Sequence, residues 1–139
     1  MKTVKDLMTR DVQTIVSTAA IAEAAKLMRD GDFGLLPVGT PERLEGTISD
    51  RDIVIRAIAE GKGADTPVAG VMSAGVSAVR EDDTLAEASA QMQKHRVRRL
   101  PVLNANGQLV GILSLGDLAV EPMDLQPAAK ALKDISTPS

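Results

Sequence analysis

The chain has 139 residues, 16 basic and 19 acidic, with one His, one Phe and no Cys, Trp or Tyr. Without Cys there is no disulfide, thiolate zinc site or thiol nucleophile, and one His excludes a multi-His metal site, so we expect no metal and no required cofactor. The net charge of -3, the scarcity of aromatic residues and the lack of a signal peptide or long apolar run predict a cytoplasmic protein that binds neither nucleic acid nor membranes.

The first half of the chain predicts one β-α-β-β-α unit. From Ile21, apolar residues at i, i+3, i+4 and i+7 predict a helix, with Ser17 or Thr18 as its N-cap and Gly31 at its end. In chain order we expect a turn, a strand, a helix, two strands and a helix, over residues 4–8, 13–16, 21–31, 35–39, 44–49 and 50–60.

The same order of elements recurs in the second half of the chain, so we interpret the sequence as two copies of one unit. In the second copy Asp82 or Asp83 is the expected helix cap, and Asn106-Gly107 indicates a hairpin. We place repeat one at 1–63, repeat two at 64–121, and a tail with a possible short helix at 122–139. The matched blocks begin at Val4, Ile21, Leu36 and Gly46, and again at Val68, Leu85, Leu100 and Gly111.

Half of this chain has too little core to fold alone. We therefore expect an α/β (α+β) fold in which the two repeats pack as a pseudo-twofold pair. The segment 52–59 is apolar nearly all round, which indicates burial on two sides. Its second side is covered either by another chain in a homodimer or by the other half of a monomer.

The motif Gly-x-x-Ser-x-x-Asp occurs twice, each time where a strand is expected to turn into a helix. At such a junction Ser49 and the first helical N–H groups suit a phosphate, and the Asp52 carboxylate can accept from two ribose hydroxyls. Ser114 and Asp117 repeat the arrangement. The competing interpretation is a plain capping box in each repeat, because Ser-x-x-Asp also satisfies a helix start and duplication copies structural caps.

With these residues the chain resembles the tandem CBS-domain proteins, whose paired domains form a Bateman module. The resemblance covers about residues 5–120 and rests on the element order, the two Leu-Pro-Val strands, and the segments Gly-Thr-Ile-Ser-Asp-Arg-Asp and Gly-Ile-Leu-Ser-Leu-Gly-Asp. The chain is similar in particular to small stand-alone bacterial CBS pairs. The family implies binding of AMP, ADP or ATP, and in some members NAD or S-adenosylmethionine, in clefts between the repeats.

The resemblance also implies which residues form the two pockets, each drawing on both repeats. For phosphate and ribose it implies Ser49, Arg51, Asp52, Ser114, Asp117, Arg98 and Arg99. In the pocket of Asp117 it adds Ile112, Gln13, Phe33, Gly34 and Arg99, and in the pocket of Asp52 it adds Thr47, Ser77, Val97 and Arg98. Leu35 in repeat one occupies the position that Arg99 has in repeat two, and Gly116 in repeat two occupies the position that Arg51 has in repeat one. The two pockets are therefore expected to differ in phosphate affinity.

The sequence therefore predicts a regulatory adenine-nucleotide-binding module for energy or redox sensing, acting on its own dimer or on an unknown effector protein. The alternative is a structural or protein-interaction dimer module without a nucleotide ligand. An enzyme is disfavoured, since no base, metal site or nucleophile stands out. The basic run from Lys94 to Arg99 is interpreted as a solvated helix end with Arg98 and Arg99 facing phosphate.

Overall fold

The computed structural model describes residues 2–75 and 77–119, so the predicted helix in 122–139 lies outside the described residues. The described chain forms two compact units, one of residues 13–75 and one of residues 2–12 with 77–119. We call them the 13–75 unit and the 77–119 unit. Each contains helices and a three-stranded sheet, which is the mixed α/β fold predicted from the sequence.

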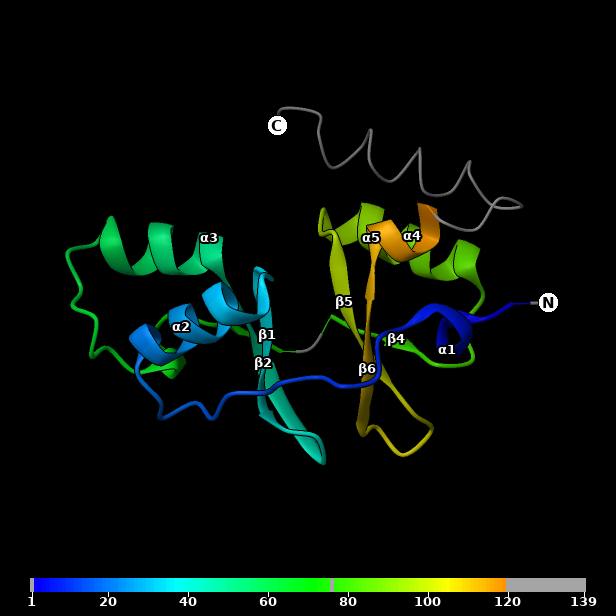
Figure 1. The fold of residues 1–139 in the computed structure, drawn as a ribbon, viewed down its shortest axis with the longest axis horizontal. Coiled ribbons are helices and arrows are strands. Elements are labelled where there is room, and N and C mark those ends of the chain that lie inside the picture. Colours follow the sequence, from blue (N-terminus) through cyan, green and yellow to red (C-terminus); the bar gives the residue numbers. More distant parts are fainter. Residues whose placement is uncertain (1, 76, 120–139) are drawn as a thin grey trace. The chain divides into compact units, whose positions relative to one another are not determined.

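The 13–75 unit has the sheet order β1-β2-β3, with both pairs antiparallel. Figure 1 shows α2 and the α3–η1 segment on one side of β1 and β2. The strand expected at 13–16 is reduced to one parallel bridge from Ile15 to Val38. The elements are α2 (Ile21–Gly31), β1 (Leu35–Thr40), β2 (Arg43–Ser49), α3 (Asp50–Ile53), the π-helical η1 (Val54–Ile58), the 3-10 turn η2 (Val68–Gly70) and β3 (Ser73–Ala74).

The 77–119 unit has the sheet order β4-β5-β6, in which β4 runs parallel to β5 and β6 runs antiparallel to it. The Asn106-Gly107 turn joins β5 to β6 as expected, with Gly107 at a φ of 77°. The elements are α1 (Val4–Leu7), β4 (Val79–Arg80), α4 (Leu85–His95), β5 (Arg99–Leu103), β6 (Leu109–Ser114) and α5 (Leu115–Ala119).

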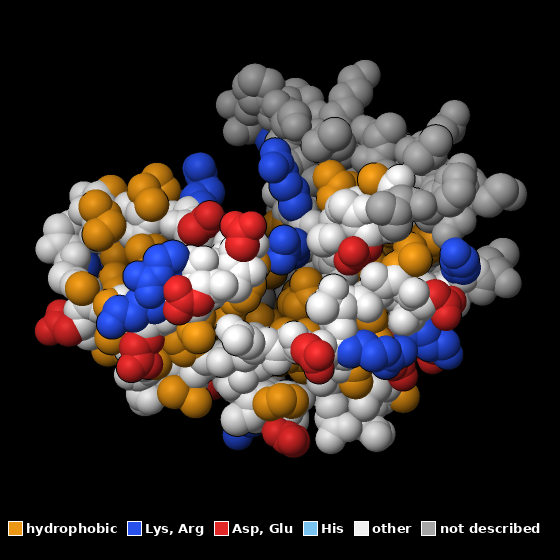
Figure 2. Space-filling model, in the orientation of Figure 1, with side chains coloured by type: hydrophobic (Ala, Val, Ile, Leu, Met, Phe, Trp, Pro, Cys, Tyr) orange, Lys and Arg blue, Asp and Glu red, His pale blue; other side chains and the backbone are white. Residues whose placement is uncertain are grey.

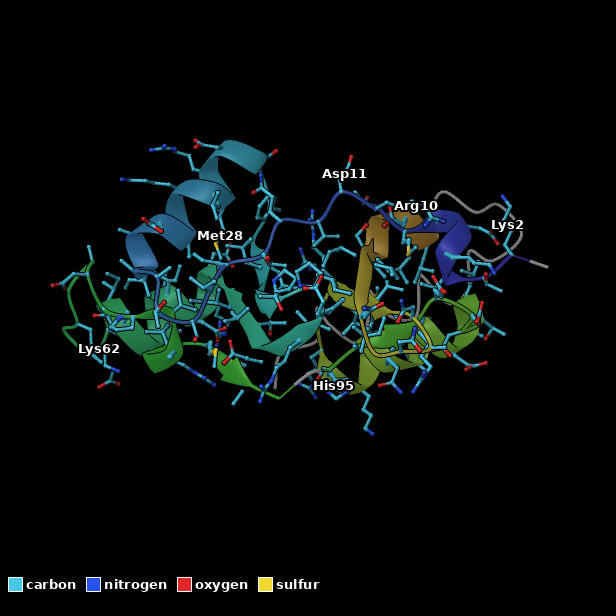
Figure 3. The ribbon with its side chains drawn as sticks, turned by 90° about the horizontal axis from the view of Figure 1, so that it is seen from below. Lys2, Arg10, Asp11, Met28, Lys62 and His95 are labelled. Carbon is cyan, nitrogen blue, oxygen red and sulfur yellow. The ribbon has the colours of Figure 1, made fainter. Side chains whose placement is uncertain are left out.

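Each unit takes the leading segment of the other sequence repeat into its core. Val68 and Val71, which open repeat two, are buried in the core that contains Ile15, α2 and β1. Val4 and Met8, which open repeat one, are buried with α4, β5 and β6. Arg10 and Asp11 lie in the segment between Met8 and Gln13, and both are exposed (Figure 3). The compact units therefore differ from the sequence repeats 1–63 and 64–121, because each leading apolar segment is buried in the core that the later part of the other repeat forms.

The helix caps differ from those expected from the sequence. The N-cap of α2 is Ala20, which offers no side-chain bond, so neither Ser17 nor Thr18 caps it. The N-cap of α4 is Thr84, whereas Asp83 instead accepts the N–H of Arg80. Gly31 does end α2, and the next residue, Asp32, adopts a left-handed φ of 55°. The path of the chain into each helix thus leaves α2 without a side-chain cap and gives α4 the cap Thr84.

We expect Thr84→Ala to lower the free energy of unfolding by about 1 kcal/mol, because the Thr84 hydroxyl oxygen accepts the N–H of Glu87 at the start of α4. Urea denaturation measures the change. Thr18→Ala is the matched control, since Thr18 is exposed and does not cap α2. Equal losses for the two variants would show that the cap contributes nothing specific.

The helix predicted from Asp50 to Glu60 changes its hydrogen-bond pattern after one turn. Beyond α3 the bonds widen to a five-residue spacing, as in the 2.9 Å bond from the N–H of Ala59 to the carbonyl of Val54. No helix among the described residues is long and apolar enough to cross a membrane.

Candidate functional site

The first Ser-x-x-Asp motif forms a reciprocal capping box where β2 turns into α3. The N–H of Ser49 donates to Asp52 Oδ2 at 2.9 Å, and the N–H of Asp52 donates to Ser49 Oγ at 3.0 Å. Two backbone donors that have no partner within a helix start are thus satisfied by side chains. Both residues are half-buried.

The second motif repeats this geometry where β6 turns into α5. The N–H of Ser114 donates to Asp117 Oδ2 at 2.8 Å, and the N–H of Asp117 donates to Ser114 Oγ at 3.1 Å. The structural role considered in the sequence analysis is therefore confirmed for both copies: each motif is a capping box.

The cap uses only part of each side chain, so it does not exclude a ligand. Each Asp engages its Oδ2 atom, and each Ser hydroxyl accepts through its oxygen while its own proton stays available to an acceptor. The other carboxylate oxygen of Asp52 lies 3.9 Å from Arg56 Nε. The Asp52 side chain is 16% exposed, which leaves part of it accessible to solvent and to a ligand.

The glycine of each motif serves the protein's own backbone. A β-carbon on Gly46 would collide with the carbonyl oxygen of Ser73 in the adjacent strand β3. A β-carbon on Gly111 would lie 2.6 Å from Sδ of Met8 and 2.9 Å from the carbonyl oxygen of Thr9, whose residue pairs with Ile112. At Gly46 the approaching group is therefore the backbone of β3, and at Gly111 it is the segment of Met8 and Thr9.

The two motifs have different neighbours within their own units. The N–H of Asp50 donates to the Gly34 carbonyl at 3.0 Å, and at the equivalent place the N–H of Leu115 donates to the Arg98 carbonyl at 2.7 Å. The strand partner of Ser49 is Leu35, whereas the partner of Ser114 is Arg99. Gly34 and Leu35 thus lie beside the first motif, and Arg98 and Arg99 beside the second.

Thr47 and Ile112 occupy equivalent half-buried positions on β2 and β6, two residues before the motif serine. Their side chains share a strand face with that serine, because strand residues alternate with a period of two. Arg51 is exposed in the first turn of α3, and Gly116 is exposed at its counterpart. The roles of Thr47, Ile112 and Arg51 in ligand binding stay predictions.

The remaining predicted pocket residues are described within their own units, Gln13 and Phe33 in the 13–75 unit and Ser77 and Val97 in the 77–119 unit. Phe33 is half-buried against the core of its unit, and its ring lies where a β-carbon on Gly31 would stand. Val97 packs against the other core, and Gln13 is exposed. The Ser77 hydroxyl lies 3.5 Å from Nδ1 of the exposed His95, labelled in Figure 3. Their roles in adenine binding stay predictions.

Arg56 is a functional candidate that the sequence interpretation did not include. Its guanidinium hydrogen-bonds the Met72 carbonyl at 3.1 Å and approaches Asp52 from one helical turn away. The i, i+4 spacing of Asp52 and Arg56 is the sequence signal that indicates this pair. Through Arg56 the motif is connected to the segment leading into β3.

A second feature of the 13–75 unit is an exposed apolar face on α3–η1, defined by Val54, Ile55 and Ile58. These side chains are 55%, 48% and 63% exposed, while Ala57 on the opposite side is fully buried. Figure 2 shows hydrophobic side chains gathered over this segment. The segment 52–59 is thus apolar on two sides, as expected. The side of Ala57 is buried in the unit, and the side of Val54, Ile55 and Ile58 is exposed.

Among residues 2–75 and 77–119, no group of three or more His, Asp or Glu side chains is arranged to hold a metal ion.

Comparison with known proteins identifies both halves of the chain. The family model described as "CBS domain" matches residues 4–58 and again residues 68–124. The CBS domain-containing protein YhcV of Bacillus subtilis is 43% identical over 136 residues, which are 98% of this chain and 96% of that protein. Hypoxic response protein 1 of Mycobacterium tuberculosis is 36% identical over 121 residues, which are 86% of this chain and 84% of that protein.

Solved structures give the same result and include bound ligands. Hypoxic response protein I with two coordinated zinc ions has a TM-score of 0.78 at 34% identity, covering 86% of this chain and 98% of that one. A CBS domain protein of Pyrobaculum aerophilum complexed with AMP has a TM-score of 0.79 at 30% identity, covering 92% and 98%. The CBS domain pair of protein MJ0100, in complex with 5'-methylthioadenosine and S-adenosyl-L-methionine, has a TM-score of 0.77 at 27% identity, covering 85% and 97%.

Proposed function

Because the chain belongs to the CBS-domain family, with two CBS domains in tandem, we propose that it is a regulatory module that binds an adenosine-containing ligand. The observation that carries this proposal is the pair of motifs Ser49/Asp52 and Ser114/Asp117. Each keeps a second carboxylate oxygen and a serine hydroxyl proton beyond those the cap uses. Similar CBS pairs in complex with AMP, and with S-adenosyl-L-methionine and 5'-methylthioadenosine, support it.

In this proposal each motif aspartate accepts hydrogen bonds from ribose hydroxyls, and the motif serine donates its hydroxyl proton to phosphate or to another acceptor of the ligand. The capping box holds both side chains in place before the ligand arrives, so little side-chain entropy is lost on binding. Arg51, Arg98 and Arg99 supply positive charge for phosphate. Occupancy is transmitted because the ligand favours the arrangement of the protein to which it binds more tightly.

Calorimetry and thermal denaturation with AMP, ADP, ATP, NAD and S-adenosylmethionine test the proposal. At a ligand concentration of about 100 Kd we expect a stabilisation of about 2.7 kcal/mol, read as a rise in Tm. If none of these compounds binds the wild-type protein, the chain is a structural or interaction module and the motifs are caps alone. The same samples test catalysis, since release of phosphate from ATP above the buffer rate would contradict a regulatory role.

We further propose that the protein is a homodimer and that the α3–η1 face covers itself in a second copy. In a dimer with a twofold axis, a surface patch on the axis contacts the same patch of the second copy. An apolar face such as this one can contact itself without bringing like charges together. An exposed cluster of three large aliphatic side chains on one short segment is costly to leave in water.

We expect Ile55→Asp combined with Ile58→Asp to convert the dimer into a monomer, because the partner face would then bury two charges without partners. Sedimentation velocity measures the change in mass. Val16→Asp is the matched control, since Val16 is 52% exposed outside this face. A wild-type protein that sediments as a monomer, or a double variant that stays dimeric, would contradict the proposal.

A further inference from the structure

Arg56 joins two segments of the 13–75 unit that both contribute predicted ligand-binding residues. Its Nη1 atom donates to the carbonyl oxygen of Met72 at 3.1 Å, and its Nε atom lies 3.9 Å from Oδ1 of Asp52. Met72 is followed by β3, whose first residue, Ser73, pairs with Thr47 of β2. One guanidinium therefore links the first turn of α3, which carries Asp52, to the segment that leads into the strand beside Thr47.

The separation between Arg56 and Asp52 leaves Oδ1 of the carboxylate available to a ligand. Charge-assisted N–H···O bonds are about 2.7–2.9 Å long, so at 3.9 Å the guanidinium attracts this oxygen without hydrogen-bonding to it. The other oxygen, Oδ2, accepts the N–H of Ser49 at 2.9 Å. The carboxylate is thus held from two sides, by the cap at one oxygen and by the positive charge at the other. A ligand hydroxyl can still donate to Oδ1.

The place of Arg56 is set by the fold as well as by its helix. It lies in the middle of the π-helical η1, a type of helix that is rare and is frequently found at functional sites. Its bond to the Met72 carbonyl reaches a residue 16 positions along the chain. The Arg56 side chain is 52% exposed, and ion pairs that exposed contribute little to stability. The pair therefore matters more for the orientation of the Asp52 carboxylate than for the free energy of unfolding.

We propose that Arg56 is a positioning residue for ligand binding at the first motif. Through its attraction for Oδ1 it holds the Asp52 carboxylate in the orientation in which that oxygen accepts the ribose hydroxyls. Through its bond to Met72 it holds α3 beside the segment that leads into β3. This inference rests on the proposed function and adds to it a residue that acts through Asp52. Because adenosine and AMP share the ribose, loss of the guanidinium should weaken both to the same degree.

Calorimetry with adenosine and with AMP tests the proposal in an Asp117→Asn background, in which the second motif is weakened. Arg56→Gln removes the positive charge and retains an amide N–H group. We expect both ligands to bind about threefold to fivefold more weakly, the range for a partly exposed ion pair. A loss confined to AMP would mean that Arg56 contacts the phosphate directly, and it would overturn the inference.

A double-mutant cycle separates an effect through Asp52 from a general effect on the fold. AMP is titrated into four proteins in the same background, with and without Arg56→Gln and with and without Asp52→Asn. We expect Arg56→Gln to change AMP affinity by less than about 1.5-fold once Asp52→Asn is present, because the charge that Arg56 attracts is gone. An equal loss with and without Asp52→Asn would show that Arg56 only supports the fold.

Arg43→Gln is the matched control, because it removes the same charge from an exposed position in the same unit. Arg43 lies at the other end of β2 from Ser49, about 20 Å away along the strand. It should leave both affinities unchanged, and a loss equal to that of Arg56→Gln would contradict the proposal. If neither adenosine nor AMP binds the wild-type protein, the proposed function itself fails. Binding that is indifferent to Arg56→Gln refutes only the role of Arg56.

Discussion

Replacing both motif aspartates, as Asp52→Asn with Asp117→Asn, should leave the Tm of the ligand-free protein nearly unchanged and make the ligand-induced rise in Tm clearly smaller. Asparagine keeps one oxygen that can accept the N–H of Ser49 or Ser114, so each cap survives. Its other terminal atom is an amide nitrogen, which cannot accept from a ribose hydroxyl. Losing a hydrogen bond to a charged group costs about 1.5–3 kcal/mol, so we expect about 10- to 100-fold weaker binding at each motif.

The corresponding alanine variants separate the two roles of the motif. Asp52→Ala and Asp117→Ala remove cap and ligand contact together, so each should also lower the free energy of unfolding by about 1 kcal/mol. If the aspartates hold a ligand, the Asn and Ala variants should both bind it weakly, and only the Ala variants should also lose stability. Wild-type affinity in the double Asn variant would mean that these carboxylates are caps and nothing more.

Gly46→Ala should lower the free energy of unfolding by about 1–3 kcal/mol, the cost of forcing an extra atom into a packed contact. The new methyl group would collide with the carbonyl oxygen of Ser73, which is backbone and cannot rotate away. Strand β3 would have to separate from β2, and with it the segment that places Val71 in the core. Urea denaturation measures the loss.

Gly70→Ala is the control for this experiment. A β-carbon at Gly70 would come no closer than 3.8 Å to its nearest neighbour, Thr66 Cγ2. We therefore expect a change within about 0.5 kcal/mol. If Gly46→Ala is equally mild, the close approach of β3 to β2 is not required for stability. Gly111→Ala should cost less than Gly46→Ala, because its closest neighbour would be the flexible Met8 side chain, at 2.6 Å, and the Thr9 carbonyl oxygen would lie 2.9 Å away.

The parts of the site that the sequence predicted well are local ones. Ser and Asp three positions apart at a strand-to-helix junction can satisfy each other's backbone N–H, and both copies do so. The strands around Leu36 and Leu100 were also predictable, because short apolar runs bounded by turn residues favour strands. The helix caps were not predictable, because several polar side chains near each helix start could reach a free N–H, and the backbone path brings Thr84 to α4 and none of them to α2.

Other features depended on contacts between residues far apart in the sequence. The exposure of Val54, Ile55 and Ile58 follows from which side of α3–η1 packs on the core, and an all-round apolar segment does not reveal that side. The position of Asp50 over Gly34 likewise requires the start of β1 to lie against the start of α3.

The duplication, the helices and strands after Ile21 and Leu85, and the two Ser-x-x-Asp motifs could be recognised from residue order alone, because all of these are local patterns. Which core receives the leading segment of each repeat is a matter of packing between distant residues. Val4 and Val68 are apolar enough for either core, and packing places Val4 with α4 and β5 and Val68 with α2 and β1. The close neighbours of Gly46 and Gly111 were likewise not predictable, since they depend on which segment lies alongside each strand.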